Sequence, residues 1–221
     1  MRCPMKSLPQ ILRGVSPYMK QHGFSKKGNC FFRLENDIAF CVAVDCPTTI
    51  AYVTFFIIPL FVPSRNRYYT YGNRLNHVMP NAFPALDLTV PESSVTGWTM
   101  QFKAGTENVI FPFFEKIESP EKMVHFIDSN GNVQNFFHCP EIQLTRLLMF
   151  THAYLRDFGK LDVLTQNMTE QINDCSFLSM QVLAKYSDEV NTIKRILPHE
   201  ESLDEYFTDI IRNTKLACFG Q

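Results

Sequence analysis

The sequence predicts an α+β fold: an antiparallel sheet with packing helices, followed by an all-helical C-terminal part. Near the start, apolar residues recur at helical spacing. Three strand-like runs follow, separated only by short polar connections. Beyond residue 140, the spacing of apolar residues is helical again. Short connections favour antiparallel hairpins, because a parallel crossover needs a dozen or more residues.

The first predicted element is an amphipathic helix from Ser7 to about Gln21. Its apolar face is formed by Leu8, Ile11, Leu12, Val15 and Met19. Ser7 can cap the helix by accepting a hydrogen bond from a free backbone N–H. Gly23 can adopt the left-handed conformation that ends a helix.

Three strands are expected next, over Cys30–Leu34, Ile38–Val44 and Ile50–Phe61. Their Val, Ile, Phe and Tyr residues suit a pleated sheet. In the second strand the large side chains alternate with the small residues Ala39, Cys41 and Ala43. We expect the first helix to pack on this small-residue face.

The stretch from Tyr18 to Arg33 runs Tyr-Met-Lys-Gln-His-Gly-Phe-Ser-Lys-Lys-Gly-Asn-Cys-Phe-Phe-Arg. It resembles the opening of the domain-of-unknown-function 4304 family. Further on, Gly97-Trp98 and residues 109–114 are similar to that family's Trp strand and its Pro-containing helix. The resemblance covers about residues 6–130 and implies an α+β domain in a bacterial intracellular protein. Some relatives are suspected to be immunity proteins against toxins. The chain departs from the family pattern at Ala43–Thr49, where relatives carry polar residues.

The remaining predicted elements follow in order. Pro63 to about Pro84 is expected to be a long connection, and Leu86–Val90 and Val95–Phe102 short strands, the second of which contains Trp98. A helix should start after Thr106 and another at Ser119-Pro120. The polar run at 128–132 is a strong breaker of regular structure. It divides the chain into an α+β domain at 1–130 (helix, antiparallel meander, two helices) and a helical region at 131–221.

The long connection is the candidate binding surface, because it interleaves basic and aromatic residues. Tyr and Arg are favoured at protein interfaces, and the same mixture can bind nucleic acid by stacking and phosphate contacts. The formal net charge of -1 argues against nucleic acid. We therefore expect a protein partner, bound by Arg65, Arg67, Tyr68, Tyr69, Tyr71 and Arg74.

Composition and motifs bound the remaining possibilities. Seven cysteines without a regular spacing indicate free thiols and a cytoplasmic protein. Cys41 and Cys46 with His138-Cys139 could supply zinc ligands, but no C-x2-C pair is present, so we expect no metal. Neither a membrane span nor a cofactor is expected, and no P-loop, G-x-S-x-G or H-E-x-x-H motif occurs.

These observations favour a bacterial cytoplasmic protein that works by binding another protein, with an immunity-type factor as one form. The alternative is a small-molecule-binding domain or enzyme with a pocket between the sheet and the C-terminal helices. The sequence leaves catalytic activity open.

Overall fold

The computed structural model describes residues 7–47, 49–66, 71–81, 83, 85–87, 93–129 and 141–221. Contacts divide the chain into two compact units. The first comprises Met1–Ile58 and Tyr71–Phe126, and the second Pro59–Thr70 and Ile127–Gln221. The second unit thus takes in a segment that the sequence division at residue 130 assigned to the first part.

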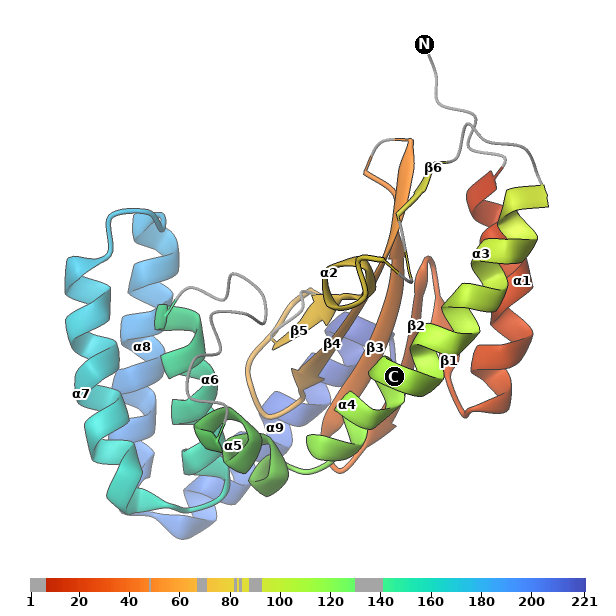
Figure 1. The fold of residues 1–221 in the computed structure, drawn as a ribbon. Helices are drawn as coiled ribbons and strands as arrows, with labels where there is room; N and C mark the ends of the chain where they lie inside the picture. Colours follow the sequence, from red (N-terminus) through yellow and green to blue (C-terminus); the bar gives the residue numbers. More distant parts are fainter. Residues whose placement is uncertain are drawn as a thin grey trace. The chain divides into compact units, whose positions relative to one another are not determined.

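The first unit contains the predicted antiparallel sheet (Figure 1). Its strands are β1 (Ser25–Lys27), β2 (Cys30–Glu35), β3 (Ile38–Asp45), β4 (Ile50–Pro59) and β5 (Tyr71–Arg74), in that spatial order, with β6 (Leu86–Asp87) pairing with β4. The α+β fold class is confirmed. β2, β3 and β4 fall where the sequence predicted strands.

The turn between β2 and β3 explains why the register of this hairpin is well defined. Glu35 pairs with Ile38, so that only Asn36 and Asp37 form the loop. Both have positive φ angles, 49° and 57°. A two-residue hairpin loop favours such angles, and Asn and Asp accept them at little cost.

One layer of helices covers the sheet in the first unit (Figure 1). It is formed by α1 (Ser7–Gln21), α3 (Ser93–Gly105), the π-helical stretch η1 (Thr106–Ile110) and α4 (Phe111–Lys116). Phe114 of α4 lies 5.0 Å from Phe40 of β3 between ring centroids, and Tyr18 of α1 stacks on Phe111. The helices therefore lie on the face of Phe40, so the expectation that α1 covers the small-residue face is wrong.

The strand predicted at Val95–Phe102 is a helix, α3. Trp98 and Phe102 are four residues apart and both buried, with their rings stacked 5.9 Å apart. Met100, between them, is 69% exposed. The apolar spacing here is helical, and an alternating interpretation would have put Met100 on the same face as Trp98.

The connection predicted from Pro63 to Pro84 also contains regular structure, namely β5 and α2 (Leu75–Val78). Strand β5 pairs closely with β4: a Cβ at Gly72 would lie 2.1 Å from the carbonyl oxygen of Phe55. Only glycine fits there without separating the strands. Of the run predicted as a strand at 86–90, β6 covers Leu86–Asp87, and the rest lies outside the described residues.

The second unit contains helices α6 (Glu141–Tyr154), α7 (Phe158–Asp174), α8 (Met180–Ile196) and α9 (Glu200–Phe219). Helix α5 (Pro120–Ser129) crosses the boundary between the two units, which lies after Phe126. The segment Pro59–Thr70 contributes to this helical core, because Phe61 stacks on Tyr154 of α6 with centroids 4.4 Å apart. No described helix is both long and apolar enough to cross a membrane.

Candidate functional site

The described members of the predicted basic and aromatic set are divided between the two units. Arg65 is exposed in the second unit, whereas Tyr71 and Arg74 belong to the first. The remaining three, Arg67, Tyr68 and Tyr69, lie outside the described residues.

Tyr71 is a core residue. Its side chain is 1% exposed, and its ring stacks on Phe113 of α4 with centroids 6.2 Å apart. Its assignment to a binding surface is therefore wrong. The stretch that was predicted to be a loop forms β5 here, and Tyr71 is one of the buried residues of this strand.

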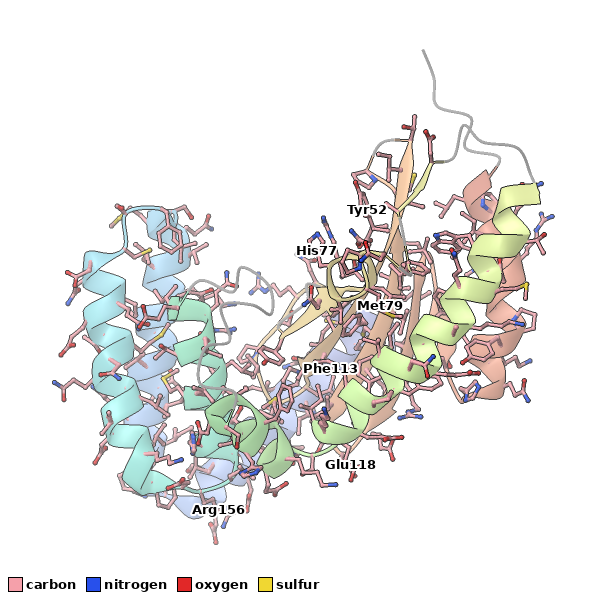
Figure 2. The ribbon with its side chains drawn as sticks, viewed as in Figure 1. Tyr52, His77, Met79, Phe113, Glu118 and Arg156 are labelled. Carbon is pink, nitrogen blue, oxygen red and sulfur yellow. The ribbon has the colours of Figure 1, made fainter. Side chains whose placement is uncertain are left out.

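Arg74, the other predicted binding residue described in the first unit, has a partly exposed side chain. Its guanidinium lies 5.0 Å from the ring centroid of Tyr52. Tyr52 is on β4, between the residues that pair with β6 and those that pair with β5 (Figure 2). This distance is within the range of a cation–π contact.

A pocket lined by described residues lies in the second unit, where α6 begins and α7 ends (upper left in Figure 1). We call it the α6–α7 hollow; its volume is about 530 Å³. It is lined by Glu141, Ile142, Asn167, Glu170, Gln171, Asp174, Cys175 and Phe177. The residues come from the first turn of α6, the last two turns of α7 and the connection to α8.

The α7–α8 connection contributes a large apolar side chain, Phe177, to the lining of the hollow. Helix α7 ends at Asp174, and Cys175 adopts an extended conformation. Ser179 then caps α8, its hydroxyl accepting from the backbone N–H of Val182 at 3.4 Å. Between these fixed points Phe177 is 66% exposed, and Met180 at the start of α8 is 80% exposed.

The hollow carries a concentrated negative charge. Three of its lining residues are exposed carboxylates, from Glu141, Glu170 and Asp174, and the lining contains no Lys or Arg. Across the described part of the chain, no cation forms an ion pair with any of the three. Glu170 accepts a hydrogen bond from the amide of Gln166 at 3.1 Å.

Gln171 of the lining has a neutral acceptor that is not accessible to solvent. The Oε1 atom of Gln171 is buried and has no hydrogen-bond partner among the described residues. A buried acceptor left unpaired costs free energy within the fold. The exposed lining of the hollow thus offers carboxylate acceptors to a ligand and contains no Lys or Arg.

A second cluster of charges in this unit is paired internally. Arg146 of α6 donates two hydrogen bonds to Glu189 of α8, at 2.6 and 2.7 Å, and a third to the carbonyl oxygen of Pro63 at 3.0 Å. Its guanidinium also lies 5.2 Å from the ring centroids of Phe150 and Tyr186.

The pKa values of this cluster follow from its burial. Burial alone lowers the pKa of Arg146, but the hydrogen bonds and charge of Glu189 more than offset it, so that the pKa is raised. Burial, and then the charge of Glu189, raise the pKa of Tyr206 to about 12, although Arg146 opposes this. The Arg146–Glu189 pair thus links α6 to α8 and, through the carbonyl of Pro63, to the segment at 59–70.

The described candidate zinc ligands, Cys41 and Cys46, are not part of a metal-binding arrangement of described residues. Cys41 is fully buried in β3, Cys46 is half-buried, and His138 and Cys139 lie outside the described residues. No group of three or more His, Cys, Asp or Glu within the described ranges is arranged to hold a metal ion.

The sequence prediction missed the hollow. The available signal was Phe177-Leu178 in a mainly polar connection, Asn-Asp-Cys-Ser-Phe-Leu-Ser, where an aromatic residue has no helix face to join. Its acidic residues come from positions about 30 residues apart along the chain. Their proximity depends on the antiparallel arrangement of α6 and α7.

A scan against protein-family models, a search of curated proteins and a search of solved structures each found no match. The resemblance to the domain-of-unknown-function 4304 family stays a prediction.

Proposed function

We propose that this chain is a non-enzymatic module that binds another protein through the α6–α7 hollow. The observation that carries the proposal is Phe177, which lines a concave site of about 530 Å³ and is 66% exposed, with the 80% exposed Met180 three residues further along the chain. Aromatic residues and Met are enriched at protein interfaces. Large apolar side chains held at a concave site are the usual anchors of such contacts.

The local structure supports this use of the surface. The connection is short, and its two ends are fixed by the end of α7 and by the Ser179 cap. Side chains presented from such a connection lose little conformational freedom on binding, which favours affinity. In this proposal Phe177 inserts into the partner, and the carboxylates of the hollow surround the contact.

The family resemblance would make this module an immunity-type factor in the bacterial cytoplasm. In that form of the proposal the partner is a toxin, which the chain blocks by occupying part of its surface. A neutralisation assay with the toxin encoded beside the gene would test it.

A small-molecule site is the second candidate function. The volume of the hollow is within the range of roughly 300–1,000 Å³ found for ligand pockets. Such pockets usually enclose most of the ligand, whereas the lining carboxylates and Phe177 are exposed. This exposure favours a protein partner.

Site-specific crosslinking tests the main proposal. The photoreactive residue p-benzoylphenylalanine would replace Phe177 in the full chain, produced in its native cells. Illumination should give a discrete adduct with a second protein. The matched control places the same residue at Val163, which is 59% exposed on α7 and does not line the hollow.

The adduct should form at position 177 and be absent at 163. It should also weaken when Glu170→Gln and Asp174→Asn are introduced together. Equal labelling at both positions, or no adduct at 177, would count against the hollow as a protein-binding site.

A further inference from the structure

The charge of the α6–α7 hollow specifies the chemistry of its occupant. Glu141, Glu170 and Asp174 line one concave site, and no described Lys or Arg neutralises them. Like charges that line one site repel one another, whereas an entering cation is attracted to all three carboxylates. An acidic or neutral segment would not gain this attraction.

The hydrogen-bonding groups indicate the same kind of occupant. The exposed carboxylates of Glu141, Glu170 and Asp174 carry only acceptors, and no Lys or Arg among the described residues donates to them. Lys and Arg side chains carry only donors, so they match this lining. Arg in particular can satisfy several acceptors at once.

The apolar part of the lining adds a second requirement. Ile142 forms a buried wall, and Phe177 projects at the mouth with 66% of its surface exposed. An apolar side chain next to the cation could cover Phe177. The aliphatic stem of Lys or Arg could meanwhile lie along Ile142.

We infer that the partner segment presents a Lys or Arg side chain flanked by a large apolar residue, the cation entering the hollow and the apolar residue covering Phe177. This inference rests on the proposed function, since it names the chemistry of the partner at the same site. Long-range attraction between the acidic hollow and a basic segment would also speed association, and salt would reduce the effect.

Selection from a random-peptide display library on the immobilised full chain tests the inference without knowledge of the partner. The selected pool should be enriched in Lys or Arg adjacent to Leu, Met, Phe or Trp, compared with the unselected library. Individual selected peptides would then be synthesised with a fluorescent label. Their affinity would be measured by fluorescence polarisation at low and high salt.

The variants separate the two parts of the recognition. Glu170→Gln and Asp174→Asn should each weaken binding roughly two- to fivefold, which is typical for an exposed ion pair, and should reduce the salt dependence. Phe177→Ser should weaken it about tenfold or more, as expected for an aromatic anchor. The control Asp162→Asn removes an exposed carboxylate of α7 outside the hollow and should leave affinity unchanged.

The outcomes distinguish the inference from the function on which it rests. Peptides that lose binding with Phe177→Ser but are not basic, and are indifferent to Glu170→Gln and Asp174→Asn, would overturn the basic-segment inference and leave protein binding at the hollow intact. Peptides unaffected by every hollow variant, or a pool without enrichment, would overturn both. Displacement of selected peptides by spermidine but not by an uncharged peptide of equal length would support the cationic chemistry.

Discussion

Replacing Glu189 by Gln tests whether the Arg146–Glu189 pair stabilises the helical unit. The side chains of Arg146 and Glu189 are only 12% and 9% exposed. The change keeps the size of the side chain but removes the negative charge, leaving the guanidinium between Phe150 and Tyr186 without a counter-ion.

The expected cost is about 3 kcal/mol of unfolding free energy. Loss of one partner from a buried ion pair costs roughly 3–5 kcal/mol, because the other charge stays buried and unpaired. The lower end applies here, since the Gln carbonyl still accepts one hydrogen bond and Pro63 still accepts another. For a chain of this length, that corresponds to a fall in Tm of about 6–12 °C.

Urea unfolding followed by far-ultraviolet circular dichroism measures this effect. Trp98 is the only tryptophan and lies in the first unit, so its fluorescence reports that unit separately. Asp204→Asn is the control, because its pair with Arg156 is 72% exposed on the Asp side. Such a pair contributes about 1 kcal/mol or less.

A double variant completes the test. Arg146→Met with Glu189→Leu removes both charges and should recover most of the lost stability, since well-packed apolar replacements of buried ion pairs are often neutral. A Glu189→Gln variant within about 0.5 kcal/mol of the parent would refute the argument. So would a double variant no more stable than the single one, since it would show that the unpaired charge is not the source of the cost.

Three further outcomes are expected. Gly72→Ala should lower stability by about 2 kcal/mol or more, because its Cβ would meet the backbone of β4 at 2.1 Å; an unchanged urea midpoint would contradict this contact. Burial and Glu189 raise the pKa of Tyr206 to about 12, so its contribution to stability is full below the usual pKa of about 10 and is lost as pH rises towards 12. Tyr206→Phe should therefore flatten the stability curve in that window, and an identical pH dependence would contradict the assignment. Phe177→Ser should change the free energy of unfolding by less than about 0.5 kcal/mol, since that side chain is 66% exposed; a larger loss in the same denaturation experiment would mean that it stabilises the fold.

The sheet could be predicted from the sequence because its signals are local. The Asn36-Asp37 turn determines the β2–β3 hairpin, and β-branched and aromatic residues mark β3 and β4. Helix α3 was harder to predict from the sequence, because Thr, Gly and Trp have low helix propensities. Its structure is determined by the packing of Trp98 and Phe102 on one side, which is a tertiary effect.

The candidate site was beyond the same approach. The predicted connection contained the right residue types for binding, but Tyr71 belongs to a strand, where burial decides its role. The hollow instead joins Glu141 to Asp174 across the length of two helices. A local sequence pattern does not indicate which helix ends lie next to each other in the folded chain.

The segment Pro59–Thr70 has a consequence for synthesis on the ribosome. It supplies Phe61, which covers Tyr154, the carbonyl of Pro63, which Arg146 binds, and the carbonyl of Asn66, which accepts from the thiol of Cys218. The last contact spans 152 positions, so the segment leaves the exit tunnel long before its helical partners exist. Nascent chains would carry Phe61 uncovered through most of translation, and a fragment starting at Ile127 would never receive it. Expression of the helical half alone should therefore give an incompletely closed core, which co-expression of the preceding residues could complete.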